Sequence, residues 1–298
     1  MKFDLQTISV LLAFSVLPLI LLLGMKIDRA RRANLERPPQ DSKLLRPAGY
    51  SLSEHLDNTI ERVISKLLWA SGLCGFAAFF MIVGLRFIAF HSSVFGTAIF
   101  ASLAVTFLLG SVVATVRAMG TVRQVRDLRL GLRGEQAVAE VLHEVGDAGF
   151  RAFHDLPGGA DWNIDHVVVG TRGVYMIETK ARRRRKSRNG KPSHVVVYDG
   201  KALQFPSGTD IRAIHQAERN MRWLSVYLEK KTGEPVQVEP LVVLPGWFVE
   251  YGNGNFRVRV MNANYLARYL RDKPQILEAA QVRRIITALD EKCRDIEF

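Results

Sequence analysis

Three acidic residues and a lysine occupy positions where an isolated charge is unfavourable. Glu178 and Lys180 lie two residues apart in the segment IETK, so on a strand their side chains share one face. Asp165 lies within the preceding Val-rich segment, NIDHVVV. Glu135 comes three residues before Val138 and so shares the apolar face of its predicted helix. Because buried charges need partners, this pattern predicts one shared site.

Grouped carboxylates of this kind favour a hard divalent cation, since Mg²⁺ and Mn²⁺ prefer oxygen ligands. We expect Asp165 and Glu178 to hold the ion, and Glu135 to add a ligand directly or through water. The ion would polarise phosphorus and lower the pKa of a bound water. Lys180 could orient or deprotonate that water and stabilise the developing charge. The alternative is that these residues form ordinary salt bridges at a strand edge.

A run of basic residues follows Lys180 directly. Residues 181–191 read ARRRRKSRNGK, with seven basic residues and no acid. Such a loop can bind backbone phosphates without reading base sequence. The alternatives are a solvated loop and a loop that contacts anionic lipid. The position beside the predicted metal site favours nucleic acid, with the candidate contacts Arg182, Arg183, Arg184, Arg185, Lys186 and Arg188.

Composition and missing motifs exclude several other classes. The chain has 298 residues, 48% of them apolar, yet 41 Lys and Arg against 29 Asp and Glu give a net charge of +12. A charged fraction of 23% excludes a wholly disordered chain, and two cysteines exclude a disulfide framework. No GxxxxGK[ST], GxGxxG, GxSxG or HExxH motif is present. Nucleotide, serine and zinc hydrolysis therefore have no local support.

The elements that must position these residues form an α/β pattern from about residue 118. The turn Gly170-Thr171-Arg172-Gly173 separates two apolar runs and predicts a β-hairpin carrying Asp165 and Glu178. We expect a mixed β-sheet flanked by helices. The predicted helices span residues 132–145, 210–229, 263–272 and 275–293, and the predicted strands span 150–154, 164–169, 173–179, 195–198, 241–244 and 256–261, the last as an edge strand.

Three long apolar runs precede this α/β region, over residues 8–25, 67–90 and 94–116. The first has 18 uncharged positions, and the third has no charge. Helices of such lengths approach the thickness of a bilayer, so we predict three transmembrane helices, the last two forming a hairpin. The alternatives are a cleaved signal peptide for the first run and a buried soluble helical hairpin for the other two.

The basic flanks of these runs predict their orientation. Lys and Arg crowd residues 26–37 and 117–129, whereas the link 91–93 has neither. The positive-inside rule then puts residues 26–66 and 117–298 in the cytoplasm and the N-terminus outside. Within the first cytoplasmic segment, Ser51 and Glu54 match a capping box before an amphipathic helix. That helix is expected either to lie on the inner membrane surface or to run straight into the second span.

The combination of these motifs resembles a known family. The segments GLRGE (131–135), NIDHVVVGTRGVYMIETK (163–180), VYDGKALQF (197–205) and HQAERNMRWL (215–224) are similar to the nuclease-related domain, or NERD, family of the restriction-endonuclease-like PD-(D/E)XK superfamily. The resemblance covers roughly residues 128–250. It implies a mixed sheet flanked by helices and a Mg²⁺-dependent nuclease centre. By position, Asp165, Glu178 and Lys180 match the core triad, and Glu135 matches the acid of the preceding helix.

The resemblance also singles out Gln216, which matches a glutamine on the later helix. Gln216 lies off the apolar stripe of its helix, on a half-apolar face with Asn220, Trp223 and Tyr227. Related nucleases often have Gln-x-x-x-Tyr here, and this chain departs from that pattern with Asn220. A role in the site and a plain surface position therefore both stay open for Gln216.

We therefore expect a membrane-anchored, Mg²⁺-dependent (or Mn²⁺-dependent) nuclease that hydrolyses phosphodiester bonds of nucleic acid, with DNA as the favoured substrate. The alternatives are an inactive nucleic-acid-binding or scaffold module on the membrane, and a membrane protein whose basic loop binds anionic lipid. The expected location is a bacterial plasma membrane, with the nuclease-like domain in the cytoplasm. The expected divisions are a first transmembrane helix (1–30), a linker with an amphipathic helix (31–66), a transmembrane hairpin (67–117), the nuclease-related domain (118–255) and a C-terminal strand with helices (256–298).

Overall fold

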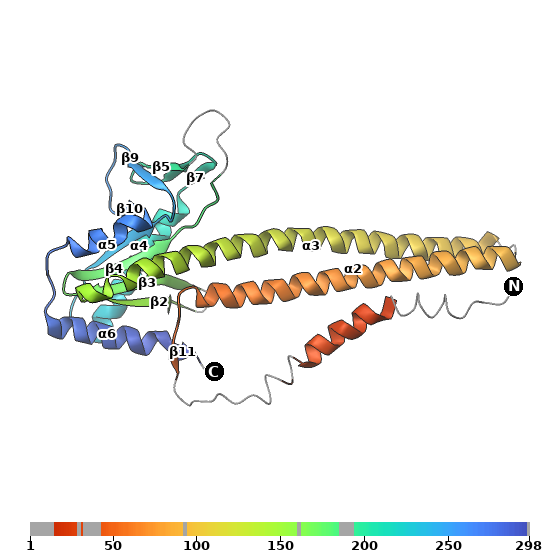
Figure 1. The fold of residues 1–298 in the computed structure, drawn as a ribbon, viewed down its shortest axis with the longest axis horizontal. Helices are drawn as coiled ribbons and strands as arrows, with labels where there is room; N and C mark the ends of the chain where they lie inside the picture. The colour runs from red at the N-terminus through yellow and green to blue at the C-terminus, as the bar shows by residue number, and fades with distance from the viewer. Residues whose placement is uncertain are drawn as a thin grey trace. The chain divides into compact units, whose positions relative to one another are not determined.

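The computed structural model describes residues 15–28, 31, 43–91, 94–159, 162–184 and 194–296. The chain forms two compact units, one from Met1–Arg37 and Leu56–Asp127 and the other from Pro38–His55 and Leu128–Phe298. Two long helices each contribute residues to both units: α2, Tyr50–His91, and α3, Val94–His143 (Figure 1). The predicted amphipathic helix thus runs straight into the second apolar run, and the predicted helix 132–145 is the end of α3.

In the first unit, α2 and α3 lie side by side. The Ser111 hydroxyl donates to the Ala70 carbonyl at 2.9 Å, and the rings of Phe80 and Phe107 stack at 5.4 Å. Both helices are long and apolar enough to cross a membrane. Only 22% of the most apolar window of α2 and 6% of that of α3 are buried. A buried soluble hairpin would hide these side chains, so their exposure disfavours that alternative.

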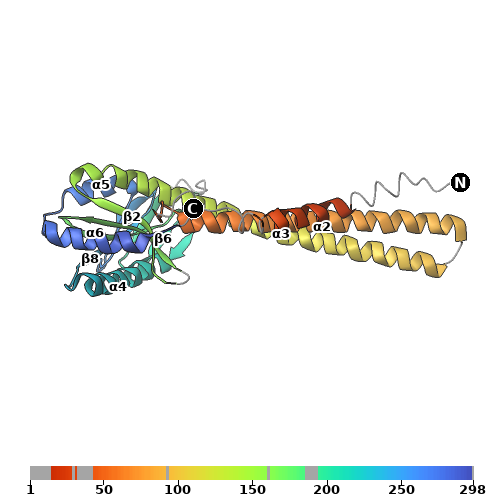
Figure 2. The same cartoon turned by 90° about the horizontal axis from the view of Figure 1, so that it is seen from below.

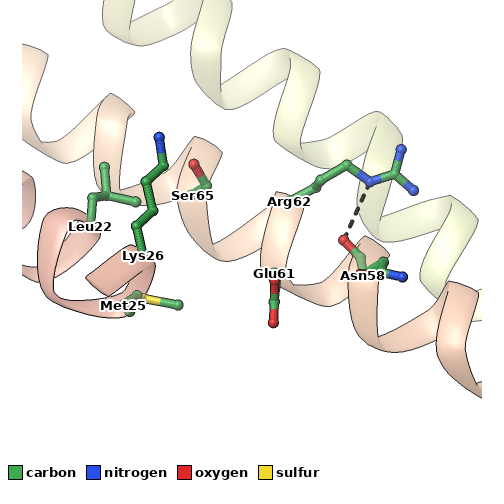
Figure 3. Close-up of a pocket in the computed structure, with 7 residues that line it drawn as sticks. All are labelled: Leu22, Met25, Lys26, Asn58, Glu61, Arg62 and Ser65. Carbon is green, nitrogen blue, oxygen red and sulfur yellow. Dashed lines mark hydrogen bonds between the residues drawn. The ribbon is translucent and has the colours of Figure 1, made fainter. Parts of the chain in front are cut away.

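The first predicted span, residues 8–25, is described only in part. Residues 8–14 of the run lie outside the described residues, and residues 15–25 belong to a helix of residues 15–28. Among the helices described, two rather than three meet the length and composition of a membrane span. The shorter helix and α2 line a pocket of about 360 Å³, in which Leu22, Met25 and Lys26 lie opposite Glu61 and Arg62 (Figure 3).

The second unit is built on a five-stranded mixed sheet of order β10-β8-β4-β3-β2. Strands β2 (Arg151–Pro157), β3 (Asn163–Gly170) and β4 (Gly173–Thr179) are antiparallel, while β4, β8 (Val238–Val243) and β10 (Arg259–Met261) are parallel. The predicted β3–β4 hairpin is confirmed, with Gly170 opposite Gly173. Gly173 has a φ of 131°, a conformation that side-chain-bearing residues rarely adopt. β10 is the predicted edge strand.

The expectation of one mixed sheet is wrong in one respect, because several strands form a separate sheet. Its order is β7-β6-β5-β9, from Gly208–Asp210, Leu203–Phe205, Val195–Tyr198 and Phe248–Tyr251. Local turn chemistry explains why β5 and β6 pair with each other. The Asp199 carboxylate accepts from the Lys201 and Ala202 N–H groups and folds β5 back onto β6.

Helices cover both faces of the five-stranded sheet (Figure 2). On one face, α4 (Arg212–Thr232) and α6 (Ala279–Cys293) enclose a core that includes Met176, Leu224 and Leu289. On the other face, the end of α3 and α5 (Ala263–Arg271) enclose a second core that includes Leu142 and Ile177. The structure is therefore a mixed α/β arrangement, as predicted.

Residues 43–53 also belong to the second unit. The short strand β1 (Leu44–Leu45) pairs with β11 (Arg294–Ile296). Arg46 forms ion pairs with Asp155 at 2.8 Å and with Asp295 at 2.7 Å. The predicted capping role of Ser51 is wrong, because α2 begins at Tyr50 and the Ser51 hydroxyl donates to Asp155 instead. The buried Asp155 carboxylate thus competes successfully for this hydroxyl.

Candidate functional site

The predicted acids Asp165 and Glu178 meet at the carboxyl end of β4. The Thr179 N–H donates to Asp165 Oδ2 at 2.6 Å, which fixes the carboxylate of β3 against the last residue of β4. Glu178 is only 1% exposed and Asp165 only 7%. The Lys180 N–H donates to the Val243 carbonyl of β8 at 2.9 Å, so β4 stays in register with β8 up to this point. The Val-rich strands therefore carry two carboxylates into buried ground.

Lys180 is the cation of this cluster. Its Nζ lies 2.7 Å from Glu178 Oε1 and donates to Gln216 Oε1 at 3.2 Å. Burial by itself would lower the pKa of Lys180, but the charges of Glu178, Asp165 and Asp210 outweigh it and hold the pKa above its usual value. Lys180 is therefore an ammonium ion at neutral pH. The hydrogen bond also brings Gln216, whose role the sequence leaves open, next to the predicted triad.

Glu135 reaches the same region from α3. It is 6% exposed, and its Oε2 is buried with no hydrogen-bond partner among the residues that the structure describes. The neighbouring Gly134 explains how the helix comes so close, because a Cβ there would lie 2.6 Å from the Cβ of Ala181. Only a residue without a side chain permits this approach of α3 to the segment that follows β4. The GLRGE motif thus combines a contact residue with an acid.

The acids raise one another's pKa values because they are buried together. Burial, followed by the charges of Asp155 and Glu178, raises the pKa of Glu135 from 4.5 to about 8. Burial and the charges of Glu178 and Glu135 also raise the pKa of Asp165 well above its usual value. Burial raises the pKa of Glu178, although Lys180 opposes the shift. The electrostatic field of the site therefore favours an added positive charge.

The donor set fits a hard divalent cation. Asp165, Glu178 and Glu135 offer only carboxylate oxygens, which Mg²⁺ and Mn²⁺ prefer. Glu135 Oε2, which accepts from no described residue, is a further acceptor at the site. In the part of the chain that the structure describes, no three His, Cys, Asp or Glu side chains are already grouped as metal ligands. The Glu178–Lys180 ion pair also occupies an oxygen that a metal would use.

Two residues of the cluster are not among the predicted site residues, although the sequence places one of them, Asn220, on the same helix face as Gln216. Asn220 is fully buried on α4, and its Nδ2 donates to Glu178 Oε2 at 3.3 Å. The available signal was its spacing, one helical turn after Gln216. Asp155 is also fully buried, and its charge acts on Glu135. Its φ of 51° is rare for a residue other than glycine and could not be read from the sequence.

The described part of the basic run leaves the site along the second sheet. The guanidinium of Arg182 lies 4.3 Å from the centre of the Phe205 ring and pairs with Asp210 at 3.4 Å. Arg183 and Arg184 are exposed, and Arg184 lies against Gly246. The other predicted contacts, Arg185, Lys186 and Arg188, lie outside the described residues. Arg182 to Arg184 thus follow the cluster directly, as the sequence order requires.

Comparison with family models finds a match over part of the chain. The family model of the nuclease-related domain matches residues 130–245, from α3 before Glu135 to the end of β8. The matched range contains all three predicted metal ligands, Lys180 and Gln216. Comparisons with curated proteins and with solved structures find no match. A place in the PD-(D/E)XK superfamily is consistent with the family. Residues 130–245 of this chain are therefore similar to the nuclease-related domain.

Proposed function

We propose that the protein is a membrane-anchored, metal-dependent nuclease that hydrolyses phosphodiester bonds, with DNA as its first candidate substrate. The observation that carries the proposal is the group of buried acids Asp165, Glu178 and Glu135 with the half-buried Lys180 at the end of β4. Its raised carboxylate pKa values are typical of sites that gain from binding a cation. The arrangement of β3, β4 and β8 with flanking helices supports a restriction-endonuclease-like fold.

Each residue has a distinct part in this proposal. Asp165, Glu178 and Glu135 would hold Mg²⁺ or Mn²⁺, and the bound ion would supply Lewis-acid stabilisation of the charge that develops on phosphate. Lys180, as an ammonium ion, orients the attacking water and stabilises negative charge on the phosphate oxygens. Gln216 holds Lys180 Nζ, and Asn220 holds Glu178 Oε2, so both act as positioning residues. Arg183 and Arg184 bind the backbone of the substrate.

The proposed membrane anchor rests on the first unit. Two helices have the length and apolar composition of membrane spans, and their apolar side chains are largely exposed. Lys26 and Arg62 line one pocket, which supports a common membrane surface at that level (Figure 3). Cations at the ends of apolar segments favour the cytoplasmic side. We therefore propose that the nuclease-related domain faces the cytoplasm.

One observation favours a different function. The ion pair with Lys180 occupies Glu178 Oε1, which is one of the candidate metal ligands. Among the described residues, no three His, Cys, Asp or Glu side chains are grouped so that they could hold a metal ion. A non-catalytic module would keep this pair as a structural salt bridge and use the basic segment alone to bind nucleic acid. That module is the second candidate function.

The test is a cleavage assay with the purified full chain in detergent. Supercoiled plasmid and single-stranded DNA are incubated with Mg²⁺, Mn²⁺ or EDTA, and Asp165→Asn and Lys180→Ala are assayed beside the unmodified protein. We expect cleavage that requires a metal and that both variants abolish. Metal-dependent cleavage that survives both substitutions would overturn the site.

The same assay separates the two candidate functions. If no metal and no substrate give cleavage, while a gel shift requires Arg182, Arg183 and Arg184, the binding module is correct. A matched control is Glu229→Gln, which removes an exposed acid of α4 without touching the cluster. Its cleavage rate should equal that of the unmodified protein.

A further inference from the structure

A groove of about 340 Å³ lies between the two sheets of the second unit. Strand β9 forms one wall with Phe248, Val249 and Tyr251, and β10 with the start of α5 forms the other. The wall formed by β10 and α5 includes Arg259 and Tyr265. The groove contains no residue of the proposed catalytic cluster.

The exposed aromatic side chains of the second unit gather in this groove. Between residues 128 and 296 the structure describes every Phe, Tyr and Trp. Those with the largest exposure are Phe248 at 48%, Tyr251 at 40% and Tyr265 at 56%, and all three line the groove. Exposed aromatic rings that are gathered in one patch mark interaction sites, whereas scattered ones do not. Their concentration in one place therefore indicates a binding surface.

The groove also carries a cation among the rings. The guanidinium of Arg259 lies 5.9 Å from the ring centres of both Tyr251 and Tyr269. The Tyr251 hydroxyl donates to the Val260 carbonyl at 2.6 Å and accepts from the Val260 N–H at 2.9 Å, which fixes this ring in place. Flat rings beside a guanidinium suit a ligand that is both planar and anionic. A nucleotide of an unpaired strand has this combination, with a base to stack and a phosphate to pair.

The groove lies close to the proposed site in the sheet. Met261 of β10 is opposite Val243 of β8, which is in turn opposite Thr179 of β4. Two strand spacings put the backbones of Met261 and Thr179 about 10 Å apart. Trp247 links the two regions, since its Nε1 donates to the Arg182 carbonyl at 3.2 Å and its own carbonyl accepts from Asn262 at 2.6 Å. One nucleic-acid strand can therefore contact both Arg182–Arg184 and the groove.

We propose that the groove lined by Phe248, Tyr251, Arg259 and Tyr265 binds unstacked bases of a single-stranded nucleic acid. This inference rests on the proposed nuclease function and narrows its substrate to unpaired strands. Duplex DNA keeps its bases stacked inside the helix, so it cannot offer a base to these rings. The rings hold the strand by stacking on its bases, and Arg183 and Arg184 hold its phosphates.

The test measures binding by the full chain in detergent, in EDTA so that no cleavage occurs. The fluorescent probes are a single-stranded oligothymidylate, an abasic strand of equal phosphate number and a hairpin duplex. We expect the unmodified protein to prefer the oligothymidylate over the abasic strand by about 10-fold or more. Phe248→Ala/Tyr265→Ala should remove this preference and leave binding of the duplex and the abasic strand unchanged.

Two controls separate stacking from other effects. Phe248→Trp/Tyr265→Trp keeps flat rings and should retain the preference. Val226→Ala/Ile276→Ala removes exposed apolar side chains that lie outside the groove and should also retain it. The inference is overturned if the protein binds the oligothymidylate and the abasic strand equally, or if the double alanine variant keeps the preference. The proposed nuclease function survives either result, because phosphate binding persists; it fails if the protein binds none of the probes, and then the inference fails too.

Discussion

Buried carboxylates that repel one another destabilise a fold, and Glu135, Asp165 and Glu178 carry this penalty together. Burial raises the pKa values of all three, and one ammonium ion, Lys180, offsets only part of their charge. A protein that used these acids only as structural salt bridges would gain stability by losing one of them. Their burial in one place is therefore an argument for function at the scale of single residues.

Glu135→Gln should stabilise the protein in EDTA at neutral pH. The pKa of Glu135 is about 8 in the folded chain and near 4.5 in the unfolded chain, so folding takes up a proton between these values. The contribution to stability is complete below about pH 4.5 and is lost as the pH rises towards 8. The amide removes this loss. The melting temperature of Glu135→Gln should therefore fall less between pH 5 and pH 8 than that of the unmodified protein.

Glu140→Gln is the matched control, because Glu140 is exposed on the same helix. Its melting temperature should follow that of the unmodified protein at every pH. If Glu135→Gln melts below the unmodified protein at pH 7 in EDTA, the buried carboxylate is stabilising and the electrostatic interpretation of the cluster is wrong.

Asn220→Ala should weaken catalysis through Glu178. The substitution removes the donor that holds Glu178 Oε2, so that carboxylate loses one fixed contact. Loss of such a supporting hydrogen bond costs about 10- to 100-fold in metal affinity or activity. Initial cleavage rates measured against Mg²⁺ concentration should show a higher half-saturating concentration. Val226→Ala, exposed on the same helix, should leave it unchanged; an unaltered Mg²⁺ dependence of Asn220→Ala would remove Asn220 from the site.

Among the helices and strands, the sequence predicts those whose formation depends on residues close together in the chain. The β3–β4 hairpin follows from Gly170 and Gly173 at its turn, and α4 follows from its apolar stripe. The division into two sheets depends on how short strands distant in sequence pair, as β5 pairs with β9, which no local pattern encodes. The positive φ of Asp155 and the pairing of β1 with β11 depend on tertiary contacts in the same way.

Gly134→Ala tests how α3 delivers Glu135. The new Cβ would lie 2.6 Å from the Cβ of Ala181, so the helix or the segment after β4 must shift. We expect a loss of about 1–3 kcal/mol from overpacking and a fall in cleavage of about 10-fold or more. Urea unfolding and initial cleavage rates measure the two effects.

Gly120→Ala provides a control on the same helix, where a Cβ meets nothing within 4 Å. Alanine is the better helix former by about 1 kcal/mol, so this variant should be slightly more stable and fully active. Equal behaviour of the two variants would contradict the close approach at Gly134.

At the scale of the whole molecule, apolar surface and positive charge are separated along the chain. The exposed apolar helices lie in the first unit, and seven of the 41 basic residues lie in residues 181–191. This division is typical of a membrane anchor joined to a domain that binds a polyanion.

The proposed topology predicts the behaviour of reporter fusions. Alkaline phosphatase fused after Ser92 should be active, because the link between α2 and α3 would lie outside the cytoplasm. The same reporter at the C-terminus should be inactive, while a fluorescent protein fused there should be bright. Phosphatase activity at the C-terminus alone would reverse the orientation and place the nuclease-related domain outside.

The most direct test of the nuclease proposal is the initial rate at which the full chain cleaves a labelled single strand as Mg²⁺ is varied. We predict a saturable dependence on Mg²⁺, no cleavage in EDTA, and a rate for Asp165→Asn lower by at least about 1000-fold with Glu229→Gln unaffected. Cleavage that is independent of Mg²⁺ and Mn²⁺, or equal rates for Asp165→Asn and the unmodified protein, would contradict the proposal.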